Sequence, residues 1–140
     1  SDDLDVFVNL GLLNTEIKRW ESRPEIQGRE QAHAPSNSYS FGLNYRPTPE
    51  TYLNLHATGK SGFYYSDSHN NKSDSYILLN SSFGYNYEDW VVELWIRNLF
   101  DEYYATRGFY FGNEAPDFAD TLYERQGDPR HIGLSIRYDF

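Results

Sequence analysis

The sequence predicts an all-β fold, an antiparallel up-and-down meander of about six strands, from three observations. Apolar and polar residues alternate along most of the chain, most clearly over 132–140, where Ile, Leu, Ile, Tyr and Phe alternate with Gly, Ser, Arg and Asp. Tight turns and long polar segments separate the alternating stretches in regular succession. Aromatic residues make up 18% of the 140 residues, about double the share expected of an ordinary globular domain.

Each alternating stretch predicts a strand with one apolar and one polar face, because successive side chains of a strand project to opposite faces. Between residues 39 and 45, for example, Tyr, Phe, Leu and Tyr alternate with Ser, Gly and Asn. Within the last long loop, residues 115–126 are expected to form one or two helical turns. The predicted strands cover residues 4–18, 38–46, 51–65, 74–87, 90–99 and 130–140.

The predicted connections alternate between short and long. Short turns on one side and long loops on the other are typical of outer-membrane barrels. If Phe140 lies on the periplasmic side, both short turns lie there too, and every long loop lies outside the cell. The short turns are residues 47–50 and 88–89, and the long loops are residues 21–37, 66–73 and 100–129.

About six strands are too few to close a bacterial barrel, which has at least about eight. An open sheet edge is not tolerated in lipid, because its backbone groups would have no hydrogen-bonding partners. We therefore expect residues 1–140 to be one segment of a larger transmembrane β-barrel. The absence of methionine, even at position 1, also leads us to expect a processed product or a fragment.

Composition excludes several functions. The net charge of -9 argues against nucleic-acid binding, which needs basic stripes to meet phosphates. With no cysteine there is no disulfide framework, thiolate metal site or cysteine nucleophile. No apolar run approaches the ~18 residues that a membrane helix requires.

The segment from Val92 to Tyr104 resembles the penultimate strand of TonB-dependent outer-membrane receptors, which commonly carry Asn-Leu-Phe-Asp followed shortly by Tyr. Here Asn-Leu-Phe-Asp occupies 98–101 and Tyr103-Tyr104 follow. Gly-Asp-Pro-Arg at 127–130, leading to a terminal Phe140, is similar to the family's ending. The run Gly-Leu-Leu-Asn-Thr-Glu at 11–16 and Ala34-Pro35 also resemble it. These matches follow the expected order over most of the chain, which is identified as the C-terminal portion of such a barrel.

The resemblance implies a transporter barrel of about twenty-two strands, plugged by an N-terminal domain that residues 1–140 do not contain. The family uses energy from the inner membrane, delivered through TonB, to take up ferric siderophores, haem, cobalamin or carbohydrates. We expect uptake of an iron–siderophore complex, with outer-membrane lipid, the rest of the barrel and its plug as partners. The resemblance also implies that the barrel-assembly machinery recognises the terminal strand through Gly133, Ile136, Tyr138 and Phe140, with Ile136 in place of a more usual aromatic residue.

Candidate ligand-binding residues lie in the longest loop. Phe109, Tyr110 and Phe111 follow Arg107 and Gly108. Exposed aromatic rings stack on sugars, catecholates or porphyrins, and an arginine holds an anionic ligand. The alternative is that these rings pack the loop onto its neighbours or belong to an aromatic girdle at the membrane surface.

A second candidate set faces the barrel lumen by strand parity and would line the substrate path or touch the plug. For Glu93 and Arg97 the alternative is cross-strand pairing with neighbouring residues. The lumen set consists of His56, Lys60, Tyr64, Glu93, Trp95 and Arg97.

Metal and catalytic sites find little support. The histidines at 33, 56, 69 and 131 lack metal-site spacing, although His33 or His69 in a loop would suit haem. The acids Glu114, Asp117, Asp120 and Glu124 fit no calcium motif, so a solvated acidic loop is expected. There is no Gly-x-Ser-x-Gly, and we expect neither an enzyme nor a bound cofactor.

Two other classes remain open. One is a soluble β-sandwich that binds carbohydrate with its tyrosines as stacking platforms. The other is an outer-membrane barrel of a different kind, a porin or an enzyme. Strand count and closure distinguish these classes, because a sandwich needs two packed sheets within this chain.

Overall fold

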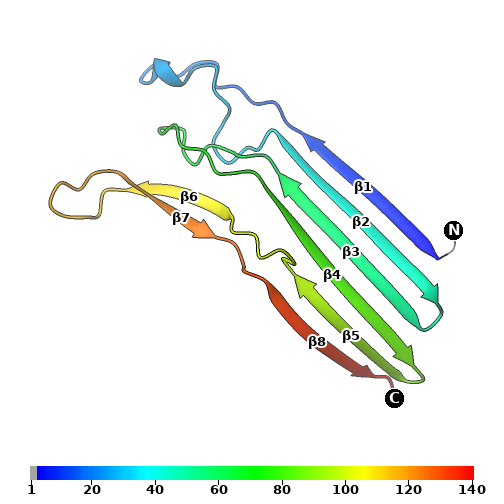
Figure 1. Ribbon diagram of the computed structural model, residues 1–140. Helices are drawn as coiled ribbons and strands as arrows, with labels where there is room; N and C mark the ends of the chain where they lie inside the picture. Colours follow the sequence, from blue (N-terminus) through cyan, green and yellow to red (C-terminus); the bar gives the residue numbers. More distant parts are fainter. Residues whose placement is uncertain (1–2) are drawn as a thin grey trace.

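A computed structural model describes residues 3–140 and contains one sheet of six antiparallel strands with a separate two-stranded hairpin (Figure 1). The order in the sheet is β1-β2-β3-β4-β5-β8, so the predicted all-β meander is confirmed. The hairpin β6–β7 interrupts the chain between β5 and β8. The elements are β1 (Leu4–Leu12), the 3-10 turn η1 (Pro24–Ile26), β2 (Asn37–Thr48), β3 (Thr51–Lys60), β4 (Tyr76–Tyr87), β5 (Trp90–Arg97), β6 (Ala105–Phe111), β7 (Thr121–Gln126) and β8 (His131–Tyr138).

The sheet is a single layer whose two ends differ. Figure 1 shows the β2–β3 and β4–β5 turns at the same end as the start of β1 and the C-terminus, and the long loops with the β6–β7 hairpin at the other end. This is the arrangement that the alternation of short and long connections predicts. The sheet has free edges at β1 and β8 within the described residues. None of the helices in residues 3–140 is long and apolar enough to cross a membrane.

One face of the sheet is apolar in nearly every row of paired strands. Leu94 on β5, for example, pairs with Phe83 on β4 and with Leu134 on β8. These side chains are exposed, Leu134 to 61% and Val8 on β1 to 70%. A single-layer sheet buries neither face within itself, so nothing within the described residues covers this apolar face.

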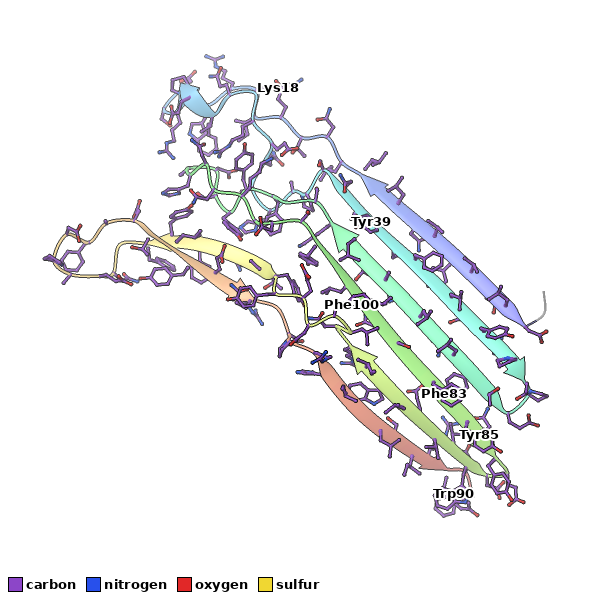
Figure 2. All side chains as sticks on the ribbon, in the orientation of Figure 1. Lys18, Tyr39, Phe83, Tyr85, Trp90 and Phe100 are labelled. Carbon is purple, nitrogen blue, oxygen red and sulfur yellow. The ribbon has the colours of Figure 1, made fainter. Side chains whose placement is uncertain are left out.

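Aromatic side chains mark both ends of the apolar face. Figure 2 shows Tyr85 and Trp90 near the turn end, and Tyr39 and Phe100 nearer the loops. At the turn end the rings of Trp90 and Tyr138 lie 4.8 Å apart between centroids. Two aromatic bands that flank an apolar zone match the girdles at the two interfaces of a membrane barrel.

Two predicted strands are much shorter than the sequence suggested, and residues 115–126 form no helix, with one hydrogen-bonded turn from the Glu114 carbonyl to the Phe118 N–H. β1 ends at Leu12 and β3 at Lys60, rather than at residues 18 and 65. Beyond Lys60 the alternation continues through Phe63 and Tyr65, but both residues leave the sheet and are buried among the loops. Residues 121–126 form β7 because they pair with β6, so the pairing decides that this segment is a strand and not helical turns.

The Asn98–Asp101 segment fastens the end of β5 to the start of β8. Asn98 has a left-handed φ of 50° and is only 4% exposed. Its side-chain nitrogen donates to the carbonyls of Glu102 (2.9 Å) and Asp128 (3.1 Å), and its side-chain oxygen accepts from the Glu102 N–H at 2.8 Å. Asp101 accepts from the Arg130 N–H at 2.7 Å. The two polar residues of this segment therefore close the base of the β6–β7 excursion.

Candidate functional site

The buried apolar side chains of the described residues lie in the loops rather than in the sheet. They are Ile17 (8% exposed), Ile26 (3%), Phe63 (2%) and Tyr65 (4%). Backbone hydrogen bonds join Ile17 to Arg29 and Gly28, which folds residues 17–29 back on themselves. These loops, residues 13–36 and 61–75, enclose a small core of their own at one end of the sheet. We call them the loop platform.

Arg29 joins the loop between β1 and β2 to the loop between β3 and β4. Its guanidinium donates to the carbonyls of His69 (2.8 Å) and Ser66 (3.0 Å) and to the side chain of Asn70 (2.9 Å). The guanidinium carbon also lies 4.4 Å from the ring centroid of Tyr64. A planar guanidinium with several fixed acceptors is a specific connector, so the two loops are held in one arrangement.

The β6–β7 hairpin docks onto this platform through one of its faces. The ring of Tyr65 covers Gly108, where a side chain would collide with it, and its phenol donates to Glu124 at 2.6 Å. The His69 imidazole stacks on Tyr110 with 3.5 Å between ring centroids. Burial raises the pKa of the Tyr65 phenol, and the hydrogen bond to Glu124 raises it further. Tyr65 therefore stays protonated and continues to donate.

The opposite face of the hairpin carries exposed aromatic rings beside two arginines. Phe109 and Phe111 lie 5.3 Å apart between centroids, and Tyr123 lies 6.4 Å from each. Arg107 pairs with Arg125 across the strands, on the same side by strand alternation. We call these five residues the aromatic–arginine face. Aromatic rings beside guanidinium groups suit a planar anionic ligand.

The four candidate loop residues from the sequence lie on two different faces of the hairpin. Arg107, Phe109 and Phe111 belong to the aromatic–arginine face, whereas Tyr110 points the other way and packs against His69. Tyr123 and Arg125 complete the face and were not predicted. Their alternation with Leu122 and Glu124 was the available signal, but it was assigned to helical turns.

Only some of the lumen candidates lie together. His56, Glu93, Trp95 and Arg97 line one groove of about 520 Å³ on the polar face of the sheet, as parity predicts. Lys60 is the last residue of β3 and does not line this groove; its ammonium lies 4.6 Å from the Phe63 ring centroid. Tyr64 is outside the sheet, between Arg29 and Lys72, so parity placed it wrongly.

Of the cross-strand pairing expected of Glu93 and Arg97, the structure shows a hydrogen bond from an uncharged partner to Glu93. Tyr52 donates to Glu93 at 2.9 Å across β4. Arg97 instead lies over the ring of Trp95 on its own strand, 5.2 Å from the centroid. Neither residue forms an ion pair within residues 3–140.

The remaining candidate histidines and acids make separate contacts and do not come together at one site. His33 packs against the Phe63 ring, and His69 faces Asp120 at 3.5 Å. Glu114 accepts from Tyr123, much as Glu124 accepts from Tyr65. Within the part of the chain that the structure describes, no three His, Cys, Asp or Glu residues come together as a metal site.

No protein-family model matches the chain. Among solved structures, it resembles the siderophore receptor PiuA from Acinetobacter baumannii, with a TM-score of 0.82 and 16% identity over 99% of this chain and 20% of that one. It also resembles the ferric yersiniabactin uptake receptor FyuA from Yersinia pestis, with a TM-score of 0.80 and 18% identity over 100% of this chain and 21% of that one. For the unliganded ferric citrate transporter FecA the TM-score is 0.69 and the identity 15%, over 96% of this chain and 21% of that one.

These likenesses define the fold. The chain has the fold of a barrel segment of TonB-dependent receptors, as its resemblance to that family predicts, and it spans about a fifth of the length of each receptor. A β-sandwich is excluded, because the six long strands form a single layer.

Proposed function

We propose that the chain forms part of the barrel wall and outer loops of a bacterial outer-membrane receptor for a ferric siderophore. The observation that carries this proposal is a single-layer sheet with one exposed apolar face, in a fold that matches three receptors or transporters of iron chelates or siderophores. The apolar face contacts outer-membrane lipid, and the free edges of β1 and β8 pair with further strands of the same barrel.

The ligand binds at the aromatic–arginine face. Ferric siderophore complexes are bulky, and many carry negative charge and flat chelating groups, which aromatic rings and guanidinium groups both accept. Phe109 and Phe111 are 38% and 50% exposed, so both present ring surface. The docked opposite face supports the proposal, because a site on a held hairpin loses less conformational entropy when it binds.

The polar groove guides the ligand inward and contacts the plug domain. His56, Trp95 and Arg97 line it. Energy reaches the plug from the inner membrane through TonB. In this proposal the chain carries no catalytic group and transports only as part of the complete receptor.

The terminal strand directs assembly of the barrel. Ile136, Tyr138 and Phe140 share the apolar face of β8 and its end, Gly133 lies on the opposite, polar face, and Tyr138 and Phe140 meet edge to face at 5.1 Å. We propose that the barrel-assembly machinery recognises this strand as it enters the membrane.

Uptake by the full-length receptor tests the proposal. The receptor is expressed in a bacterium that lacks its own siderophore receptors, and cells receive radioactive iron as catecholate, hydroxamate or citrate chelates, with haem and cobalamin alongside. We expect uptake of at least one ferric siderophore, abolished when TonB is deleted. Uptake that persists without TonB would identify a passive porin, and uptake of haem or cobalamin alone would refute the siderophore assignment.

A further inference from the structure

Aromatic rings on the polar face occupy the space above glycines of the next strand, where a Cβ would otherwise lie. Phe7 on β1 covers Gly42 on β2, where an added Cβ would lie 2.0 Å from the Phe7 ring. Tyr52 on β3 covers Gly84 on β4 with the same 2.0 Å approach. Each glycine is required because any side chain would displace the ring that occupies its place.

In both cases the ring reaches the strand beyond the glycine. Gly42 pairs with His56 on β3, and the Phe7 and His56 rings are 5.9 Å apart between centroids. Gly84 pairs with Glu93 on β5, which accepts from the Tyr52 phenol. Neighbouring strands are about 4.8 Å apart, so each ring bridges three strands.

The same arrangement occurs a third time at the edge of the sheet, where the third strand is missing. Trp95 on β5 covers Gly133 on β8, and the atoms nearest the added Cβ are Cζ2 (2.1 Å), Cε2 (2.4 Å) and Cη2 (2.7 Å). These belong to the outer, six-membered part of the indole. Figure 1 shows no strand beyond β8. The outer edge of the indole therefore lies beside an unpaired strand edge.

We infer that Trp95 seals the seam of the barrel, packing over Gly133 against the first barrel strand, which pairs with β8 in the complete receptor. This inference rests on the proposed function, because it needs the rest of that barrel. The indole N–H is already bound to Ser135 at 3.2 Å. Only C–H groups face the seam, so the residue that the first strand places opposite Gly133 presents an apolar or aromatic surface, as His56 does to Phe7.

The inference gives Gly133 a role distinct from recognition by the assembly machinery. If Gly133 serves only as a recognition position, its replacement is harmful whatever stands at position 95. If Gly133 instead leaves room for the Trp95 ring, removing the indole restores assembly of the variant barrel. The pair Tyr52 and Gly84 is the matched control, because both neighbours of β4 are already present in the sheet.

The first experiment measures assembly of the full-length receptor in cells, as the fraction with the heat-modifiable mobility of a folded barrel. Gly133→Val should lower the folded fraction at least about fivefold, since overpacking costs roughly 1–3 kcal/mol. Adding Trp95→Ala to Gly133→Val should restore most of the folded fraction. In the control pair, adding Tyr52→Ala to Gly84→Val should do the same. Failure of rescue at 95/133, with rescue at 52/84, overturns the inference. If the unsubstituted receptor forms no folded barrel, the proposed function itself falls.

The second experiment tests the seam directly. The full-length receptor is labelled with 6-fluorotryptophan, which places fluorine on Cη2, and Trp95→Phe identifies its resonance. A strand that covers the indole edge should reduce the fluorine shift between light and heavy water to a small fraction of that of free 6-fluorotryptophan. A folded barrel in which Trp95 shows the full solvent shift overturns the inference and leaves the proposed function intact.

Discussion

Tyr65 donates a hydrogen bond of 2.6 Å to Glu124, a residue 59 positions later in the chain. Tyr65 lies in the loop after β3, and Glu124 lies on β7 of the outer hairpin. The Tyr65 ring also covers Gly108 on β6, so one side chain holds both strands of the hairpin. This contact decides which hairpin face is docked and therefore which face is presented.

Tyr65→Phe keeps the ring and removes the donor. We expect the docked hairpin to be destabilised by about 1.5–3 kcal/mol, the usual range for a hydrogen bond to a charged group. Hydrogen exchange of the β6 and β7 amides in the folded receptor measures the change. Tyr123→Phe is the control, because its bond to Glu114 lies within the hairpin excursion. Equal acceleration by both variants would contradict docking through Tyr65.

The raised pKa of Tyr65 predicts how docking depends on pH. The protonated phenol is the form that donates, and its pKa in the folded protein lies above the ordinary 10.0. The stabilisation is therefore fully present below pH 10 and is lost only as the pH rises through the higher folded value. Ultraviolet titration of the receptor should show one phenol, absent from Tyr65→Phe, that ionises after the exposed tyrosines. Its ionisation together with them would contradict the prediction.

Asn98 combines a left-handed backbone with several side-chain hydrogen bonds, and two substitutions separate these contributions. Asn98→Gly keeps the backbone conformation and loses the hydrogen bonds, at a cost of about 2–4 kcal/mol at roughly 1 kcal/mol for each bond. Asn98→Ala adds backbone strain and should cost about 1 kcal/mol more. Denaturant unfolding of the full-length receptor, followed by loss of heat-modifiable mobility, measures both. Equal stability of the two variants would show that φ does not matter here.

The apolar face should reject charge, whereas the polar face should accept it. Leu94→Arg should cost about 2–4 kcal/mol in a bilayer, because lipid does not solvate a guanidinium. Thr58→Arg is the matched substitution on the polar face, where Thr58 neighbours Ser40 across the strands, and it should cost far less. Unfolding in lipid vesicles compares them. A larger cost at Thr58 would reverse the assignment of lipid and lumen.

Ligand affinity should depend on the aromatic–arginine face and not on Tyr110, which lies on the opposite face of the hairpin. Arg107→Ala or Phe109→Ala should weaken binding of the transported ferric chelate about tenfold, which corresponds to about 1.4 kcal/mol. Tyr110→Phe should leave the affinity nearly unchanged, because its ring still stacks on His69. Arg23→Ala is the charge-matched control, since Arg23 lies near Glu25 in another loop. Titration of the purified receptor with the chelate gives the dissociation constants.

The sequence by itself determined the two-faced sheet, because alternation is a local property that each strand carries at every second residue. The order of short and long connections likewise determined which ends of the strands lie together. Asn98 and Asp101 stood out as a motif, and the structure adds what they do: they hold Glu102, Asp128 and Arg130 in place.

Only the tertiary structure decided how the loops come together. Phe63 and Tyr65 continue the alternation of β3, yet they form the core of the loop platform. Residues 121–126 alternate as a strand would, but pairing with β6 decides that they form one, and docking decides that the hairpin face with Tyr110, not the face with Phe109, is covered. These outcomes depend on contacts between residues far apart in the chain, such as Tyr65 with Glu124, which no local pattern contains.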